Sequence, residues 1–346
     1  MSCRRSEPSL PYRQHGAALV VAMFVFAICT AVIVAMKGEF NRFFQRNANQ
    51  LWLAQSEAYL RGAEELASVV LIADYDKDKE DQNPRDHLTE DWARDDAPPF
   101  AIDDSAWMRG AVEDLQGRFN LNWLAQAPQG EDDRRPRRTV HQEMFIRLLQ
   151  TLGEEVEVSE FEAIAIADSV SDWVDDNQDP LADGAEDQHY FSLTPSYRVP
   201  NMPMASVSEL RAVSNMTPEI YAALAPLVTV WPRQPGRINV NTAPVQVLRT
   251  LNEEGVLAPM SEADGQTLLD LRGDAGYADM ATFRQASVFA GREAKMAPAF
   301  AQLTETSSWF LLRAEVQLAD RNRQMYSVLW RDKRSISTMA RAAGSL

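Results

Sequence analysis

The chain opens with a basic segment that runs directly into a long apolar stretch. Arg4, Arg5 and Arg13 precede Gly16, and residues 17–36 are uncharged and mainly apolar. Such a stretch at the helical rise spans about 30 Å, the thickness of the hydrocarbon core of a bilayer. Residues 17–36 are therefore predicted to form a membrane-spanning helix. Because the positive charges precede it, the positive-inside rule places residues 1–16 in the cytoplasm and the rest of the chain on the far side of the membrane.

The place of the small residue distinguishes this segment from an ordinary secretory leader. In such a leader the cleavage site follows an apolar region of about 7 to 15 residues. Here the candidate junction, between Gly16 and Ala17, precedes the apolar region. Cleavage at this junction leaves the apolar helix on the mature protein, as in type IV pilin-like precursors. A single-pass anchor without this processing is the alternative.

Apolar residues continue beyond the membrane segment at helical spacing, which predicts a longer helix. They fall on one helical face at Phe40, Phe44, Leu51, Ala58, Leu66 and Val69. The helix is therefore expected to extend through residues 37–73. A membrane anchor followed by a separate surface helix is the alternative.

Composition restricts the partners and the sources of stability. The chain has 34 Lys and Arg against 50 Asp and Glu, so it repels phosphate backbones and anionic lipid. Its two cysteines, Cys3 and Cys29, lie in the leader and in the membrane segment. No disulfide is thus expected in the remainder, whose stability must come from a core, a metal or partners.

The remainder reads as a sheet interrupted by helices. Residues 74–106 are polar and acidic and are interpreted as a connection, and residues 107–119 favour a strand, a turn and a second strand. Residues 308–319 and 324–331 predict a hairpin. The sequence thus predicts an α+β fold, with a sheet region at 74–121 and 306–334, an inserted helical domain at 122–305 and a tail at 335–346. Two domains in series is the alternative, but each strand group alone is too small to be stable.

An acidic stretch inside the helical region carries the most chemical information. Residues 172–187 contain seven acids: Asp172, Asp175, Asp176, Asp179, Asp183, Glu186 and Asp187. Carboxylates packed this closely repel one another, so a bound cation is the natural compensation. A solvated acidic loop without a metal is the alternative.

The spacing of these acids resembles the ligand positions of an EF-hand loop. With Asp175 at position 1, Asn177, Asp179, Asp183 and Glu186 fall at later ligand positions. Pro180 replaces the usual Gly and no clear helix follows, which argues against a true EF-hand. Oxygen ligands favour Ca²⁺ over Zn²⁺.

Several motifs, taken in order, carry a family resemblance. They are RQHGAALVVAMFVFA in the leader, QSEAYLRGAE, DLQGRFNLN, DWVDDNQDP with DGAEDQHY, SELRAV and INVNTAP. Together, over residues 10–335, they resemble the minor pseudopilin K family of the bacterial type II secretion system, also called general secretion pathway protein K. The agreement of several independent motifs in order makes the resemblance specific.

The resemblance implies a pseudopilin fold, in which a long N-terminal transmembrane helix packs on a small antiparallel sheet with a large inserted helical domain. It implies cleavage and N-methylation by the prepilin peptidase between Gly16 and Ala17, and a place in the inner membrane with the bulk of the chain in the periplasm. It further implies a role at the tip of the pseudopilus, initiating its assembly and capping it during export of folded proteins across the outer membrane. The implied partners are minor pseudopilins I and J, and H as a further candidate.

The resemblance also implies calcium in the acidic loop. The first-choice ligands are Asp175, Asp179, Glu186 and Asp187, and the further candidates are Asp172, Asn177 and Asp183.

Val21 occupies the fifth mature position, where most pilin-like subunits carry a Glu that is thought to pair with the N-terminal amine of a neighbouring subunit. A carboxylate in hydrocarbon is costly without such a partner. Val21 therefore fits a subunit at the top of the filament that has no subunit above it. An unrelated single-pass anchor would also carry an apolar residue here.

Two other function classes fit the sequence less well. INVNTAPVQVLRTL resembles the first helix of a helix-hairpin-helix module, but the residues after it are acidic and lack the paired Gly that would meet DNA phosphate, so nucleic-acid binding is not expected. A membrane-anchored metal-dependent hydrolase would need an open metal site and a positioned base. The four histidines, His15, His87, His141 and His189, are scattered and no HExxH is present, so no enzyme activity is expected.

Overall fold

The computed structural model describes residues 15–82, 84–94, 98–103, 106–125, 138–153, 155–233 and 235–344. Residues 1–14 of the predicted leader lie outside this description. The chain divides into two compact units, with the boundary after Ala58.

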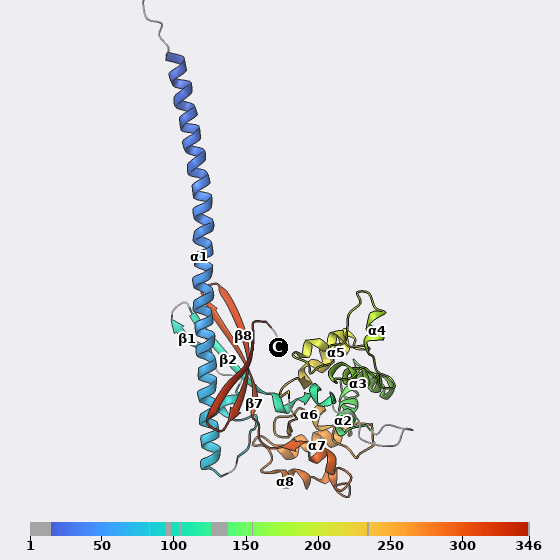
Figure 1. Ribbon diagram of the computed structural model, residues 1–346. Coiled ribbons are helices and arrows are strands. Elements are labelled where there is room, and N and C mark those ends of the chain that lie inside the picture. The colour runs from blue at the N-terminus through green and yellow to red at the C-terminus, as the bar shows by residue number, and fades with distance from the viewer. Residues whose placement is uncertain are drawn as a thin grey trace, which may run out of the picture. The chain divides into compact units, whose positions relative to one another are not determined.

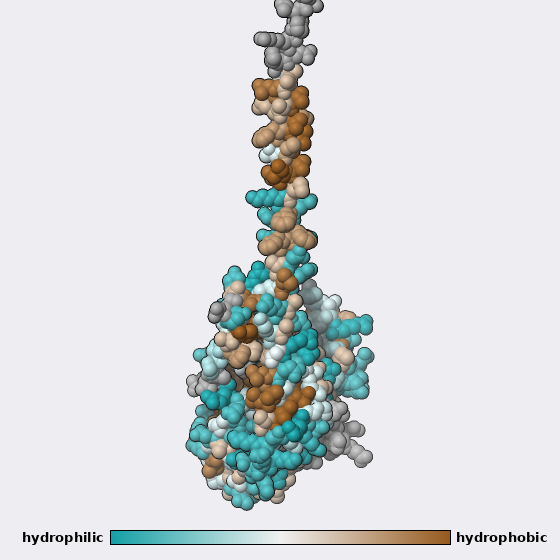
Figure 2. Space-filling model, turned by 90° about the vertical axis from the view of Figure 1, so that its left-hand side faces the viewer, coloured by the Kyte–Doolittle hydropathy of each residue, from teal (hydrophilic) through white to brown (hydrophobic). Residues whose placement is uncertain are grey.

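A single helix, α1 (His15–Glu80), contains the predicted membrane segment and its predicted extension. In the described part of the chain, one helix, Gly16–Glu80, is long and apolar enough to span a membrane, with a mean hydropathy of 2.9 over its most apolar window. Figure 2 shows the apolar residues gathered along the N-terminal part of this helix. The helix ends seven residues later than predicted, where Lys77 and Lys79 in its last turn complement the helix dipole.

A five-stranded antiparallel sheet has the order β1-β2-β7-β8-β9. Its strands are β1 (Phe100–Asp103), β2 (Ala106–Asp114), β7 (Trp309–Leu318), β8 (Arg321–Asp332) and β9 (Ser335–Ala342). The part of α1 beyond Ala58 lies against one face of this sheet (Figure 1).

Strand alternation builds the core between helix and sheet. Alternate residues of β7, from Phe310 to Val316, are buried and pack against Leu60, Ala63 and Leu71 of α1. Phe310 also meets Trp92 edge to face, with 5.1 Å between ring centroids. The α+β class and the packing of the long helix on an antiparallel sheet are confirmed.

The sheet is larger than the sequence predicted. Residues 335–346 were expected to be a tail, yet residues 335–342 form β9, which pairs with β8 from Asp332 opposite Ser335. Two of the β9 residues that face α1, Thr338 and Arg341, are polar because both donate hydrogen bonds to the buried Glu64 of α1. The usual apolar alternation of a half-buried strand is therefore missing from this segment.

Two further predictions for the sheet region were wrong in detail. The strand, turn and second strand expected at 107–119 are one strand, β2, that continues through Gly110. The short 3₁₀ helix η2 (Leu115–Gly117) follows it, and β3 (Phe119–Asn120) then pairs with β4 of the inserted region. The connection at 74–106 includes the end of α1, the 3₁₀ helix η1 (Asp91–Ala93) and β1.

The inserted region between β2 and β7 has its own apolar core, which includes Phe119, Phe145, Tyr190 and Phe283. Its α-helices are α2 (Val140–Leu149), α3 (Glu160–Val174), α4 (Asp187–Phe191), α5 (Pro218–Leu224), α6 (Val245–Leu248), α7 (Glu262–Arg272), α8 (Met280–Arg284) and α9 (Ala297–Phe300). Its 3₁₀ helices are η3 (Leu121–Ala125), η4 (Val207–Ala212), η5 (Ala225–Leu227) and η6 (Ser287–Phe289). The short strands β4 (Val228–Thr229), β5 (Ile238–Asn239) and β6 (Leu303–Thr304) complete it, with β3–β4 and β5–β6 paired in parallel.

Candidate metal site and a buried carboxylate network

Helix α3 presents two carboxylates to the acidic loop. Its start is fixed by a capping box in which Ser159 and Glu162 satisfy each other's backbone N–H groups. Asp168 and Asp172, four residues apart on one helical face, are both buried. Asp168 was not among the predicted ligands, although its spacing of four residues from Asp172 is a signal in the sequence that could have pointed to it.

The acidic loop folds back over Asp172. The backbone N–H of Leu181 donates to Asp172 Oδ1 at 3.1 Å. A Cβ atom placed on Gly184 would lie 1.9 Å from Asp172 Oδ2, so only glycine permits this approach. The Gly in DGAEDQHY is therefore required by the packing of the loop against α3.

Some predicted ligands instead shape the loop. Asp175 Oδ1 accepts from the N–H of Asn177 at 3.1 Å, and Asn177 Oδ1 accepts from the N–H of Asp179 at 2.7 Å. Asn177, Asp179 and Asp183 have exposed side chains. Asp187 Oδ1 accepts from the N–H of Val199 at 3.1 Å, which joins the loop to the following segment.

Glu186 has the least satisfied carboxylate of the loop. It is 6% exposed, and both of its carboxylate oxygens are buried without a hydrogen-bond partner among the residues that the structure describes. Burial, followed by the negative charges of Asp172 and Asp175, raises the pKa of Glu186 to about 7. Ionising a buried carboxylate that has no hydrogen-bond partner is costly in free energy, so a bound proton or a bound cation would stabilise Glu186.

Asp172 is in a similar electrostatic position. Burial, opposed by the N–H of Leu181 and reinforced by the charge of Asp175, raises the pKa of Asp172 to about 6. The charges of Asp172, Asp175 and Asp187 thus act on Glu186, and the charge of Asp175 also acts on Asp172. Such an all-oxygen set is the kind that holds a hard cation such as Ca²⁺.

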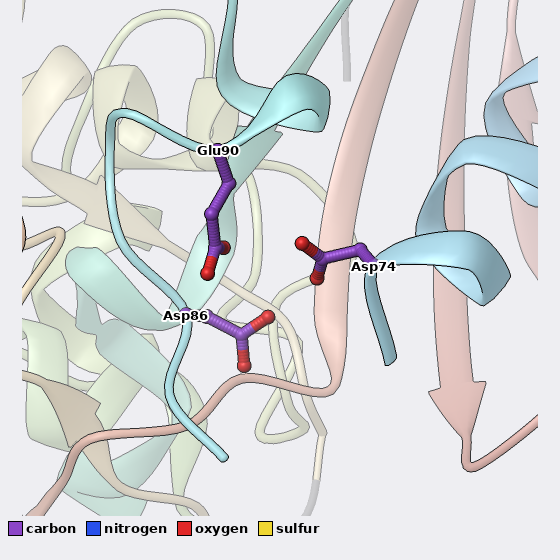
Figure 3. Close-up of side chains that lie close together, drawn as sticks. All are labelled: Asp74, Asp86 and Glu90. Atoms are coloured by element: carbon purple, nitrogen blue, oxygen red, sulfur yellow. The ribbon is translucent and has the colours of Figure 1, made fainter. Parts of the chain in front are cut away.

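The structure also contains a second acidic group that the sequence analysis missed. Asp74 of α1 and Asp86 and Glu90 of the following connection offer carboxylate oxygens that all lie within 4.8 Å of one another (Figure 3). All three residues are buried. Residues 74–106 were interpreted only as a polar, acidic connection, because the Arg that neutralises part of this group lies far along the chain.

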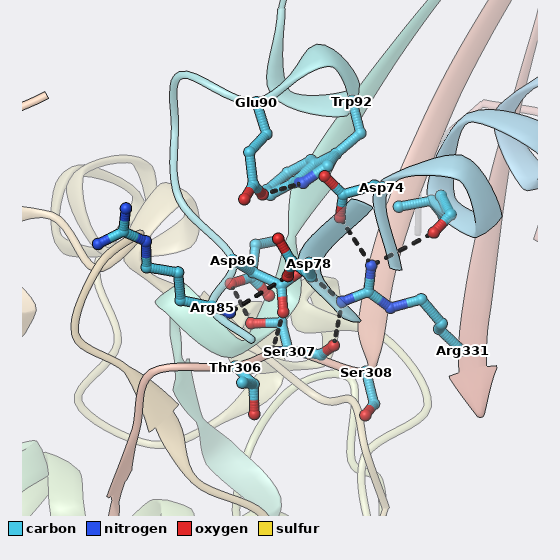
Figure 4. A network of polar contacts seen from close by, with 12 residues as sticks. Asp74, Asp78, Arg85, Asp86, Glu90, Trp92, Thr306, Ser307, Ser308 and Arg331 are labelled. Carbon is cyan, nitrogen blue, oxygen red and sulfur yellow. Dashed lines mark hydrogen bonds and ion pairs between the residues drawn. The ribbon is translucent and has the colours of Figure 1, made fainter. Parts of the chain in front are cut away.

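That residue is Arg331 of β8, which binds two of the three carboxylates (Figure 4). Its Nη1 lies 3.0 Å from Asp74 Oδ2, and its Nη2 donates to Asp86 Oδ1 and, at 2.9 Å, to the carbonyl oxygen of Ser307. Glu90 Oε2 accepts from Trp92 Nε1 at 2.6 Å and from the N–H of His87 at 3.1 Å.

The same network joins the inserted region to the sheet. Asp114, the last residue of β2, accepts from the hydroxyls of Ser307 and Thr242, each at 2.5 Å. Asn239 Nδ2 donates to the carbonyl oxygen of Asp86 at 3.0 Å. Asp114 is the first residue of DLQGRFNLN, and Asn239 and Thr242 belong to INVNTAP. Both motifs therefore stabilise the region where the chain passes from the sheet into the insertion and back again.

The remaining predicted positions lie in α1 or in the helical region. Ala17 and Val21 are exposed in the first turns of α1, and a Cβ on Gly16 would meet nothing within 4 Å. The INVNTAP segment is buried and contributes Ile238, Val240 and Ala243 to the core. It acts as scaffold in this fold.

The comparisons with known proteins agree with this architecture. Residues 117–233 and residues 238–302 each match the family described as Type II secretion system (T2SS), protein K. The Type II secretion system protein K of Pseudomonas aeruginosa is 34% identical over 334 residues, which cover 96% of this chain and 93% of that protein. This chain belongs to the type II secretion system protein K family. The family resemblance stated from the motifs is confirmed.

Further relatives support the same conclusion. The protein K of Klebsiella pneumoniae is 29% identical over 334 residues, 96% of this chain and 97% of its own length. A chain in the crystal structure of the GspK–GspI–GspJ complex from enterotoxigenic Escherichia coli matches with a TM-score of 0.73 and 25% identity, over 87% of this chain and 100% of that chain. The protein is thus a minor pseudopilin of type II secretion, a structural component anchored by its N-terminal helix. Neither the hydrolase nor the nucleic-acid alternative gains support from these relatives.

Proposed function

We propose that this protein K family member is the tip subunit of the type II secretion pseudopilus, where it initiates assembly and caps the filament. The observation that carries the proposal is its likeness, over 87% of the chain, to a chain of a GspK–GspI–GspJ complex. Val21 supports the tip position, because a subunit with nothing above it needs no carboxylate for a neighbouring amine.

The partners proposed for this chain are minor pseudopilins I and J, with H as a further candidate. An apolar pocket beside α1, lined by residues that include Leu66, Val70, Trp92, Phe100 and Met108, offers a surface for such a subunit. Figure 2 shows apolar residues gathered on this face of the molecule. Exposed apolar surface of this kind is typical of an interface.

The proposed location is the inner membrane, with the N-terminus in the cytoplasm and the bulk of the chain in the periplasm. The basic residues before the apolar segment support this orientation. Prepilin peptidase is the proposed processing enzyme, with cleavage after Gly16 and methylation of Ala17. The role proposed for the mature protein is structural, without catalysis.

Calcium is the proposed cation of the acidic loop. Burial of Glu186 without hydrogen-bond partners in the described part of the chain supports a bound cation, and Asp172, Asp175 and Asp187 lie near enough to raise its pKa. Of the predicted ligands, these four are favoured over Asn177, Asp179 and Asp183, whose side chains are exposed.

Assembly tests the proposed partners directly. The chain without residues 1–58, which retains the second compact unit, should form a stable complex with the periplasmic portions of minor pseudopilins I and J. Replacement of the exposed Leu66 and Phe100 by Asp should weaken this complex in size-exclusion chromatography, whereas Phe161→Asp, an exposed apolar position on α3, should not. If the complex forms equally well with Leu66→Asp and with Phe100→Asp, the pocket is not part of the interface.

A further inference from the structure

The buried group Asp74, Asp86 and Glu90 has more carboxylates than neighbouring cations can neutralise. Their exposed fractions are 8%, 1% and 7%. Arg331 binds Asp74 and Asp86. His87 Nε2 lies 3.4 Å from Glu90 Oε1, but burial and the nearby Arg85 and Lys77 lower the pKa of His87, which leaves the ring neutral near pH 7. Three ionised carboxylates beside one guanidinium would leave two uncompensated charges in the interior, which is costly.

The two oxygens of Glu90 have different surroundings. Glu90 Oε2 accepts two hydrogen bonds, from Trp92 Nε1 and from the N–H of His87. Glu90 Oε1 accepts from neither of these donors and lies 3.4 Å from His87 Nε2. One carboxylate oxygen from each of Asp74, Asp86 and Glu90 lies within 4.8 Å of the others (Figure 3). A proton on one of these three carboxylates removes one of the uncompensated negative charges and its repulsion of the other two.

We propose that the carboxylates of Asp74, Asp86 and Glu90 retain a proton at neutral pH, and that this proton fastens residues 84–94 to α1 and β8 as a pH-dependent latch. The guanidinium of Arg331 already engages Asp74 and Asp86, so it fills the role that a cation would have there. The latch lies beside Ser307 and Asp114, where the inserted region joins the sheet.

The direction of the pH dependence follows from the surroundings of the group. The titratable and charged residues that face it are Asp78 and Lys77 of α1, Arg85 and His87 of the connection, Arg331 of β8 and Asp114 of β2. Burial and the charge of Asp74 raise the pKa of Glu90 to about 8. Burial and the charge of Asp86, opposed by Arg331, raise the pKa of Asp74 to about 7.

The pKa values of Asp74 and Glu90 are both higher in the folded chain than in the unfolded chain. At a pH between the unfolded and the folded values, the folded chain therefore binds more protons than the unfolded chain does. The free energy of unfolding that this group contributes is therefore greatest at low pH and falls as the pH rises from about 3.8, the ordinary pKa of an Asp side chain, to about 8, the pKa of Glu90 in the folded chain. Attachment of residues 84–94 should loosen over the same interval.

The test uses the full chain in detergent with saturating calcium, so that the acidic loop is occupied throughout. Infrared difference spectra between wild type and Glu90→Gln should show the carbonyl band of a protonated carboxylic acid at neutral pH, and this band should disappear by about pH 9. Glu219→Gln, at an exposed position of α5, is the matched control and should show no such band.

Hydrogen exchange gives a second readout on the wild-type chain, which avoids any folding defect of a variant. After correction for the intrinsic pH dependence, exchange of residues 84–94 should accelerate at least about tenfold between about pH 6 and about pH 9, since one pKa unit corresponds to a factor of ten. Exchange in β7 should change much less. Absence of the carboxylic acid band, exchange of residues 84–94 that does not respond to pH, or uptake of a divalent ion that depends on Glu90 would each overturn the latch.

Discussion

At the scale of single residues, Glu186 is the position on which the proposed calcium site depends most. Its carboxylate is buried without hydrogen-bond partners among the described residues, beside Asp172 and Asp175. In the metal-free chain the raised pKa of Glu186, about 7, makes its ionisation costly, so the metal-free fold loses stability as the pH rises through the interval from about 4.5 to about 7.

Bound calcium should offset the cost of ionising Glu186. At a hundredfold excess of free calcium over its dissociation constant, the free energy of unfolding of the second compact unit should rise by about 2.7 kcal/mol. This rise should be larger above neutral pH than below it. Glu186→Gln and Asp172→Asn should each abolish most of the gain, measured as the melting temperature with calcium and with chelator. The exposed Glu219→Gln should keep the full gain, and equal melting temperatures in calcium and chelator for the wild type would exclude the site.

Gly184 tests the geometry of the loop without altering its charge. In Gly184→Ala the added methyl group would collide with Asp172 Oδ2 and push the loop away from α3. We expect a loss of about 1–3 kcal/mol, as for other overpacked sites, together with weaker calcium binding in isothermal titration. Gly62→Ala, on α1 where nothing lies within 4 Å, should be neutral or slightly stabilising. A Gly184→Ala chain with unchanged calcium affinity would contradict the described approach of the loop to Asp172.

At the scale of elements, Glu64 fixes α1 to the two C-terminal strands. Its carboxylate accepts from Ser327 of β8 at 2.7 Å, and from Thr338 and Arg341 of β9. Although burial opposes ionisation, the hydrogen bonds from Arg341, Ser327 and Thr338 lower the pKa of Glu64 to about 2. The strand that the sequence missed is thus held by a polar contact to the helix.

Because the folded pKa of Glu64 is depressed, its contribution is present above about pH 4.5 and is lost as the pH falls toward about 2. Glu64→Gln should therefore lower the free energy of unfolding by on the order of 2 kcal/mol at neutral pH, and by progressively less as the pH falls below about 4.5. Urea unfolding of the second compact unit measures this difference. Glu65→Gln, the exposed neighbour on α1, should leave the stability unchanged at every pH. A Glu64→Gln effect that does not shrink in acid would show that charge is not its source.

The sequence predicted the elements whose signal is local. The long helix, the β7–β8 hairpin and the helical insertion follow from apolar periodicity and turn residues. Strand β9 was not predicted because its inward-facing residues Thr338 and Arg341 are polar. They contact Glu64, which lies more than 270 residues away in the chain. The acidic residues of the loop were predicted from the sequence. Which of them lie close to Asp172 depends on the folding of the loop against α3 at Gly184, and the spacing of the acids along the chain does not predict this contact.

At the scale of the whole molecule, two of the family motifs lie where the inserted region joins the five-stranded sheet. DLQGRFNLN and INVNTAP supply Asp114, Asn239 and Thr242, which meet Ser307 where the insertion rejoins the sheet. The group around Arg331 could not be predicted from sequence, since Asp74 and Arg331 are separated by 257 positions. The insertion is thereby attached at both of its ends to a pseudopilin sheet that stays continuous.

The central claim is that this chain occupies one end of the filament. The most direct measurement is the position of gold-labelled full-length protein on isolated pseudopili, with a labelled shaft subunit as the control for access of the label. We expect label at a single end of each filament, because Val21 leaves no carboxylate for the amine of a subunit above. Label at regular intervals along the shaft would show instead that this chain is a repeating subunit of the filament.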